Sequence, residues 1–155
     1  MQMNKVMLGW REWVTMPELG IEAIKAKVDT GARSSALHTF ELETFSEDGI
    51  AKVRFCIHPF QHDLSVVKTC TATLLDERNV SDSGGHTELR PVILTPILLG
   101  GVSKMIEVTL TNRESMKFRM LLGRTAMTGN FTVDPQKSYL LGAPATNRPM
   151  KGTSK

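Results

Sequence analysis

Asp29 stands at the end of a stretch in which apolar and polar residues alternate, within the segment "AKVDTGARSSALH" from Ala26 to His38. An ionised carboxylate is costly to bury unless hydrogen-bond donors surround it. Gly31 and the small residues that follow allow a tight turn with backbone amides directed at the carboxylate, and Thr30 adds a hydroxyl. Asp29 is therefore either a turn residue capped by local backbone or an acid held at the edge of a cleft.

A second motif, "MLLGR" from Met120 to Arg124, has two large apolar residues, a glycine and a basic residue. Gly123 allows another backbone segment to pass closely. Arg124 opens a short stretch, "RTAMTGN", whose final Gly-Asn pair is typical of the end of a helix. A strand that ends in Asp-Thr-Gly-Ala and a later apolar-apolar-Gly-Arg before a helix resemble the two-part signature of one pepsin-like lobe.

The resemblance extends over most of the chain. It is carried by five segments: "LGWREWVTMPELG" at 8–20, "IKAKVDTGARSSALH" at 24–38, "RPVILTPILLGG" at 90–101, "IEVTLTNRESMKFRMLLGRTAM" at 106–127 and "VDPQKSYL" at 133–140. The chain resembles the retropepsin-like aspartic peptidases. It is most similar to a bacterial family described as ATP-dependent zinc proteases, related to the RimB protein that acts with the RimK glutamate ligase.

This resemblance implies roles for the Asp-Thr-Gly residues. Asp29 would be the catalytic aspartate, Thr30 would brace the loop through its hydroxyl, and Gly31 would be the position of closest backbone approach. A chain of this size supplies one such aspartate, so the resemblance implies a homodimer that brings two together. The two carboxylates would share a proton, so that one activates water while the other polarises the scissile carbonyl.

Basic residues near Asp29 suggest the kind of substrate. A cation beside Asp29 favours its ionised form, which opposes a shared proton. Arg33 and Arg124 would instead suit an acidic peptide, because guanidinium pairs with carboxylate in a fork. We predict Arg33, Arg124 and Ser34 as substrate-binding residues, and the family resemblance suggests glutamate-tailed proteins as substrates and a glutamate ligase as partner. Arg124 is equally compatible with an ion pair that ties the helix to the sheet.

A metal site needs a separate test because zinc appears in the family's description. The nearest spacing of ligands is "CIHPFQH", with Cys56, His58 and His62 as weak candidates and Cys70 or His86 as a fourth ligand. A proline between the two histidines excludes the helical spacing of zinc proteases. No phosphate-binding glycine loop occurs, so any ATP requirement would belong to a partner enzyme. We predict no bound cofactor.

Composition excludes several classes of protein. The formal net charge of +3 is matched by three basic residues between 143 and 155, so the rest of the chain is neutral. This argues against a general nucleic-acid or membrane-binding surface. No apolar run reaches the roughly 18 residues of a membrane span. Two cysteines and the lack of a signal-like start predict free thiols and a cytoplasmic location.

Residues of alternating polarity at 24–28, 53–57 and 106–110 predict half-buried strands. Closely spaced strands of this kind favour an all-β fold, a closed barrel of short antiparallel strands with one short helix near 124–130. We expect one retropepsin-like domain over 1–142 and a basic flexible tail over 143–155. The loop from Asp76 to Leu89 contains two adjacent glycines and is the most lid-like segment.

Three functions follow from these features. The first is an aspartic endopeptidase that acts as a homodimer through Asp29 on acidic peptide tails. The second is a monomeric, non-catalytic module of the same fold that binds a peptide or a partner protein through Arg33 and Arg124. The third, weakest hypothesis is a zinc-dependent hydrolase.

Overall fold

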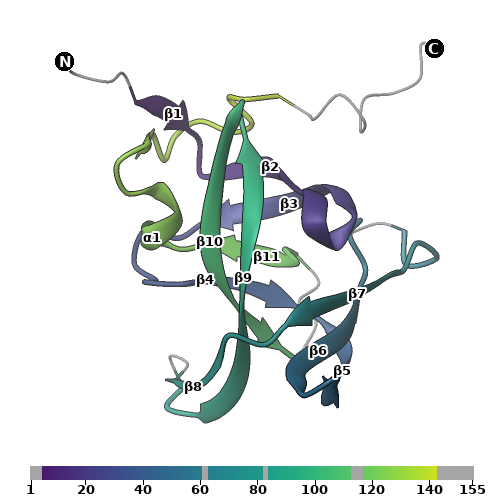
Figure 1. The fold of residues 1–155 in the computed structure, drawn as a ribbon. Helices are drawn as coiled ribbons and strands as arrows, with labels where there is room; N and C mark the ends of the chain where they lie inside the picture. Colours follow the sequence, from purple (N-terminus) through teal and green to yellow (C-terminus); the bar gives the residue numbers. More distant parts are fainter. Residues whose placement is uncertain (1–4, 61–62, 82–83, 113–116, 143–155) are drawn as a thin grey trace.

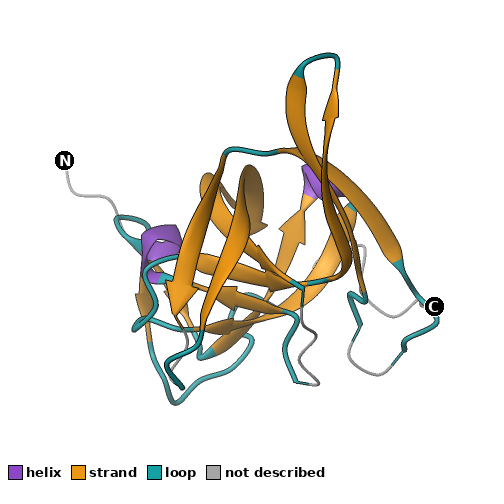
Figure 2. Ribbon diagram, turned by 90° about the horizontal axis from the view of Figure 1, so that it is seen from below, coloured by secondary structure: helices purple, strands orange, loops and turns teal. Residues whose placement is uncertain are grey.

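The computed structural model places β-strands along most of the chain (Figure 1). It describes residues 5–60, 63–81, 84–112 and 117–142. The strands are β1 (Val6–Leu8), β2 (Arg11–Met16), β3 (Ile21–Val28), β4 (Ser35–His38), β5 (Phe40–Glu47), β6 (Ile50–Ile57), β7 (Lys68–Thr73), β8 (Asp76–Ser81), β9 (Thr87–Leu99), β10 (Val102–Thr111), β11 (Met120–Leu122) and β12 (Phe131–Val133). The helical turns are the 3-10 turn η1 (Pro17–Leu19) and α1 (Arg124–Met127), on opposite sides of the molecule (Figure 2).

Six strands close into a barrel. Their order is β10-β4-β11-β3-β2-β9, and pairing between β9 and β10 completes the ring. The predicted all-β closed barrel is therefore confirmed. Four of the six neighbouring pairs are antiparallel, whereas β10–β4 and β11–β3 are parallel. Parallel neighbours need long crossover connections, which local turn signals in a sequence do not reveal.

The core is formed by the apolar members of the alternating segments. Three strands carry the pattern used for the prediction, namely β3, β6 and β10, and in each the predicted apolar positions face inward. The residues concerned, all 4% exposed or less, are Ile24, Ala26, Val53, Phe55, Ile57, Ile106, Val108 and Leu110. Because the side chains of a strand alternate between its two faces, the charged residues of these segments lie on the other face and are at least partly exposed. The alternation does not predict exposure everywhere, since Cys56, Thr109 and Thr111 on that face are also buried.

A separate three-stranded sheet, β5-β6-β7, packs against the barrel (Figure 1). Val53, Phe55 and Ile57 of β6 belong to the same apolar cluster as the barrel strands. The Cys70 thiol of β7 also donates a hydrogen bond to the carbonyl of Leu19 in η1, with 3.4 Å between sulfur and oxygen. The sheet is therefore joined to the barrel through a shared core.

The predicted short helix near 124–130 is confirmed as the single turn α1, after which the amide and hydroxyl of Thr128 both donate to the Arg124 carbonyl. One predicted element differs from the structure. The lid-like loop at 76–89 is instead a hairpin, because β8 pairs antiparallel with the first half of β9. Within the described residues no helix is long and apolar enough to cross a membrane. The predicted tail, 143–155, lies outside the described residues.

A buried carboxylate joins the two ends of the described chain. Glu12 in β2 is 0% exposed. Its Oε2 accepts hydrogen bonds from the amides of Gly9 at 2.7 Å and Leu140 at 2.9 Å, and its Oε1 accepts one from the amide of Leu141 at 3.2 Å. A buried charge is tolerated when donors surround it. Glu12 thus holds the segment after β12 against the start of the barrel.

Replacing Glu12 by alanine should destabilise the fold. The change leaves three backbone amides without their acceptor, one in a buried hydrogen bond and two in part-buried ones, and an orphaned buried donor costs about 1–3 kcal/mol. We therefore expect the free energy of unfolding to fall by about 1–3 kcal/mol or more, measured by urea denaturation. Glu22→Ala is the control, since Glu22 is an exposed carboxylate of the neighbouring strand. An equal, small effect of both substitutions would contradict the role assigned to Glu12.

Candidate active-site loop

The loop after β3 holds the Asp29 carboxylate at the surface of the barrel. The amide of Asp29 donates to the Leu122 carbonyl at 2.8 Å, which ties the loop to β11. The amide of Gly31 donates to Asp29 Oδ1 at 3.1 Å, and the amide of Ala32 donates to the Asp29 carbonyl at 3.2 Å. Asp29 remains only partly buried. The carboxylate therefore has a fixed orientation and stays accessible to solvent.

The two sequence motifs cross at Gly123. A Cβ added to Gly123 would lie 2.4 Å from the carbonyl carbon of Ser34, so only glycine fits without moving backbone. The amide of Gly123 donates to the Ser35 hydroxyl at 3.0 Å, and the amide of Arg124 donates to the Ala32 carbonyl at 2.8 Å. The close backbone approach predicted for Gly123 is confirmed, and it fixes the segment that follows Asp29.

Gly31 is not the position of close approach within this chain. A Cβ placed there would meet only Asp29 Oδ1, at 3.4 Å, among the atoms that the structure describes. The contribution of Gly31 is its amide, which is turned toward the carboxylate while the α-carbon faces open space. Thr30 is exposed, and its predicted bracing role stays a prediction.

The predicted substrate-binding residues lie around this loop. Arg124 is exposed, and its Nη1 donates to the Gly31 carbonyl at 3.4 Å, so it binds the Asp29 loop; among residues 5–60, 63–81, 84–112 and 117–142 no acid forms the alternative ion pair with it. Arg33 is exposed, while its carbonyl accepts from the amide of Thr125 at 3.2 Å and from the hydroxyl at 2.9 Å. Arg33 and Ser34 also line a cavity of about 420 Å³. The fold thus brings the predicted residues to one side of the Asp29 loop.

We call this space the arginine cavity. It lies between the hairpin strand β8 and the barrel strands β4, β10 and β11, and it contains three arginines and no acidic residue among those that line it. Its lining residues are Ala32, Arg33, Ser34, Ala36, Arg78, Asn79, Val80, Ser81, Arg90, Thr109 and Leu121. The residues predicted as lid-like therefore do form one wall of a cavity beside the loop.

Sequence reasoning missed Arg78 and Arg90. They are directly opposite each other in the β8–β9 ladder, where two like charges repel. The pairing is tolerated because each guanidinium has a carboxylate partner. Arg90 Nε donates to Glu88 at 2.7 Å, and Thr111 Oγ1 donates to the same oxygen at 3.0 Å. The alternation of side chains along both strands could have indicated which face each arginine lies on. The register that places Arg78 opposite Arg90 is set by the tertiary structure.

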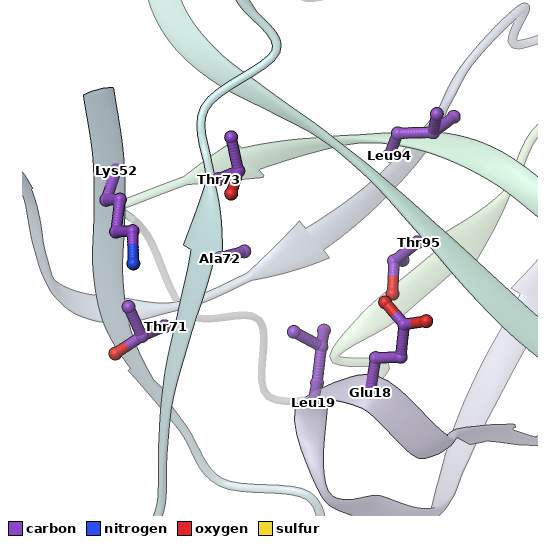
Figure 3. A pocket seen from close by; sticks show the side chains of 8 residues that line it. All are labelled: Glu18, Leu19, Lys52, Thr71, Ala72, Thr73, Leu94 and Thr95. Atoms are coloured by element: carbon purple, nitrogen blue, oxygen red, sulfur yellow. The ribbon is translucent and has the colours of Figure 1, made fainter. Parts of the chain in front are cut away.

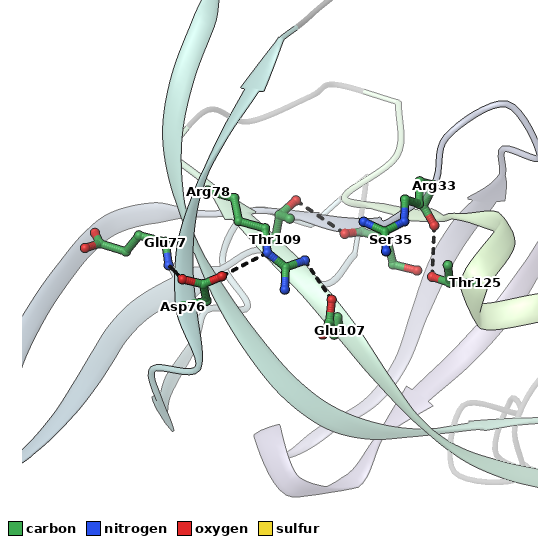
Figure 4. A network of polar contacts seen from close by, with 8 residues as sticks. All are labelled: Arg33, Ser35, Asp76, Glu77, Arg78, Glu107, Thr109 and Thr125. Carbon is green, nitrogen blue, oxygen red and sulfur yellow. Dashed lines mark hydrogen bonds and ion pairs between the residues drawn. The ribbon is translucent and has the colours of Figure 1, made fainter.

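Arg78 bridges two carboxylates (Figure 4). Its Nε donates to Asp76 Oδ2 at 3.1 Å, and its Nη1 donates to Glu107 Oε1 of β10 at 2.7 Å. The hydrogen bond from Arg78 holds the pKa of Glu107 below its usual range, and the charges of Arg78 and Arg33 lower it further. The pKa of Asp76 is lowered by the Arg78 hydrogen bond and by the amide of Glu77. All these carboxylates are thus ionised at neutral pH.

The zinc candidates are spread over different surroundings. Cys56 Sγ lies 3.6 Å from Glu41 Oε2 and 3.5 Å from Thr69 Oγ1, and the His58 ring stacks on Phe40 at 4.4 Å between centroids. Cys70 bonds to η1 on the other face of the sheet. In the described part of the chain no three His, Cys, Asp or Glu side chains gather as a metal ion requires. His62 lies outside that part.

A second cavity, of about 260 Å³, lies where the β5-β6-β7 sheet meets the barrel (Figure 3). Glu18, Lys52 and three threonines contribute its polar groups, and among these Thr95 is 2% exposed. Lys52 already pairs with Glu47 at 2.8 Å. This cavity shares no lining residue with the arginine cavity.

A closed barrel whose Asp-Thr-Gly loop crosses an apolar-apolar-Gly strand end has the architecture of the retropepsin-like class. A family model described as "Retropepsin-like aspartic endopeptidase RimB" matches residues 7–144. The chain therefore belongs to the RimB-like family, and the resemblance inferred from the sequence is confirmed.

Similar proteins place the chain in a wider context. It is 45% identical over 139 residues to a protein of Shewanella pealeana and 46% identical over 139 residues to one of Parasynechococcus marenigrum, both named "Probable alpha-L-glutamate ligase". Each alignment covers 90% of this chain but 30% of the relative, so the chain spans about a third of their length. A crystal structure of a Legionella pneumophila protein of unknown function is also similar, with a TM-score of 0.73 and 27% identity over 89% of this chain and 99% of that one.

Gly123→Ala should damage both stability and the Asp29 loop. The added methyl group would meet backbone atoms of Ser34 at 2.4 Å, and overpacking of this kind costs about 1–3 kcal/mol or more. We expect a clear fall in the midpoint of urea unfolding. Gly31→Ala is the matched control, because its Cβ would make only an ordinary contact of 3.4 Å. Equal midpoints for the two variants would contradict the close crossing.

Cys70 should resist alkylation in the folded chain. Burial raises the pKa of the Cys70 thiol to about 11, so at pH 8 it is a neutral thiol, and only the thiolate reacts readily. After iodoacetamide treatment at pH 8, mass spectrometry should find Cys70 unmodified in the folded chain and modified in urea. Rapid alkylation of Cys70 without urea would show that β7 does not pack as described.

Proposed function

We propose that the chain is an aspartic peptidase that cleaves acidic peptide tails as a homodimer through Asp29. The observation that carries the proposal is the Asp29 loop itself, an oriented and partly exposed carboxylate next to a cavity with three arginines. The family match supports the peptidase class. The arginines support the choice of substrate.

The proposed chemistry needs two copies of the chain. The sequence contains a single Asp-Thr-Gly triplet, so each subunit would contribute one Asp29 carboxylate to a dyad that shares one proton. The ionised carboxylate would take a proton from water as the water oxygen bonds to the scissile carbonyl carbon. The protonated carboxyl would donate to the carbonyl oxygen. Return of a proton to the amide nitrogen would then break the carbon–nitrogen bond and leave a free acid and a free amine.

Charge explains how an acidic substrate would be selected. Arg33, Arg78 and Arg90 line the arginine cavity, where their guanidinium groups would pair with substrate carboxylates. A neutral peptide would supply no such partners. The arginines would therefore select an acidic peptide and place it beside the Asp29 loop.

The relatives suggest the setting of this activity. The proteins named as probable α-L-glutamate ligases contain a region similar to nearly all of this chain within a much longer sequence. We propose that the chain works in the same context, with glutamate-tailed proteins as substrates and a glutamate ligase as partner. A protein that adds glutamate and one that trims it would act on the same tail.

A binding module of the same fold is the second candidate. One chain contains a single Asp-Thr-Gly triplet and so supplies half of a dyad, whereas it supplies all three arginines of the cavity. This difference favours the binding module. A monomer would thus retain the groups that hold an acidic peptide and lack the dyad that cuts it. Oligomeric state in solution, measured by light scattering, separates the two candidates.

Asp29→Asn should abolish trimming of a glutamate tail. We would incubate wild type and variant with a carrier protein that ends in four glutamates and follow its intact mass. Loss of a general acid–base group typically lowers the rate about 100-fold or more. Asp134→Asn is the matched control, because Asp134 accepts the amide two residues later at 3.0 Å, as Asp29 does, but in the turn after β12.

Other outcomes of this experiment separate the remaining candidates. Equal trimming by wild type and Asp29→Asn would remove Asp29 from the mechanism. Binding of the tail without cleavage by either protein would favour the binding module. Trimming that stops when EDTA is added and returns with zinc would support the zinc hydrolase instead.

A further inference from the structure

Glu107 is a carboxylate that interacts with two of the three arginines of the arginine cavity. It lies on β10, where its Oε1 accepts the 2.7 Å hydrogen bond from Arg78. It also lines a third cavity, distinct from that of Figure 3 and of about 260 Å³, together with Arg33 and Ser34, which line the arginine cavity as well. Glu107 is therefore a carboxylate that is hydrogen-bonded to Arg78 (Figure 4) and also influenced by the positive charge of Arg33.

The contact crosses from the hairpin to the barrel wall. Arg78 belongs to β8, which pairs only with β9 among the described strands, while Glu107 belongs to β10 of the closed ring. The side chains of both residues are partly exposed, 33% for Arg78 and 39% for Glu107. An ion pair with this much solvent access contributes little to stability, so another carboxylate can replace Glu107 at small cost.

We propose that Arg78 is a substrate-binding residue that determines specificity, and that Glu107 occupies it as an internal carboxylate until an acidic peptide displaces it. The proposal rests on the proposed function for its ligand, an acidic peptide. Displacement exchanges one carboxylate for another on the same guanidinium, so no charge is left unpaired at Arg78. A peptide without acidic side chains has no carboxylate that could replace Glu107 on the Arg78 guanidinium.

The geometry of Arg78 suits this exchange. Its Nε remains bound to Asp76 at 3.1 Å while Nη1 faces Glu107. Asp76 therefore fixes the guanidinium plane on one edge and leaves the other edge for a ligand. Arg33 lines the same cavity as Glu107, and it would pair with the next carboxylate of the same peptide. The arrangement favours consecutive acidic residues over a single one.

Binding by the Asp29→Asn chain tests the proposal without cleavage. The probe is a fluorescein-labelled tetra-glutamate peptide, with tetra-glutamine as its neutral counterpart, and the readout is fluorescence anisotropy. Glu107→Gln should tighten tetra-glutamate binding about two- to fivefold, because the internal competitor is a partly exposed ion pair. Glu47→Gln is the control, since Glu47 is a partly exposed carboxylate paired with Lys52 on the β5-β6-β7 sheet.

A double-mutant cycle separates displacement from general electrostatics. If Glu107 acts through Arg78, Glu107→Gln should have no effect once Arg78 is replaced by glutamine. Arg78→Lys should recover only part of the affinity, since an ammonium cannot bind Asp76 and a ligand with two edges of one plane. Thermal unfolding of each variant verifies that it folds.

Two results would overturn the proposal. One is that the Asp29→Asn chain fails to bind tetra-glutamate more tightly than tetra-glutamine. The other is that Glu107→Gln tightens binding equally with and without Arg78. Failure of the peptidase proposal gives a different pattern. Glu107→Gln would still tighten tetra-glutamate binding in an Arg78-dependent way, while the wild type would leave the glutamate tail uncut.

Discussion

The crossing of two backbone segments at Gly123 is the constraint on which the candidate site depends. Gly123 has no side chain, so the end of β11 can lie directly against the segment that follows Asp29. A Cβ at this position would lie 2.4 Å from the Ser34 carbonyl carbon. This close approach allows the Gly123 amide to donate to the Ser35 hydroxyl and the Asp29 amide to donate to the Leu122 carbonyl. The orientation of the Asp29 carboxylate is thus set by backbone packing and by the Gly31 amide.

Charge around the loop is arranged in a way that burial alone does not explain. Arg78 and Arg90 face each other across β8 and β9, a costly pairing that Asp76, Glu88 and Glu107 compensate. The arginines nevertheless line a cavity without acidic residues. Asp76, Glu88 and Glu107 are not among the residues that line this cavity, so the lining itself carries positive charge, which suits an anionic ligand.

The chain is complete as a barrel and incomplete as an aspartic dyad. Its six-stranded ring closes on itself, and Glu12 secures the segment after β12 with three backbone hydrogen bonds. The barrel is therefore closed by strands of one chain, whereas the dyad of the proposed function would take one Asp29 from each of two chains. In the ligase-named relatives the corresponding region is part of a longer chain.

The sequence by itself determined the local features of this protein. Alternation at positions 24–28, 53–57 and 106–110 identified β3, β6 and β10 with their inward faces, because a strand exposes alternate side chains. The Asp-Thr-Gly and Leu-Leu-Gly-Arg motifs identified the family and the loop. Only the tertiary structure decided that β11 lies parallel to β3, that Gly123 and not Gly31 is the close crossing, and that Arg78 meets Arg90 and Glu107. These contacts join residues far apart in the chain, and their register follows from how the whole barrel closes, which no local pattern encodes.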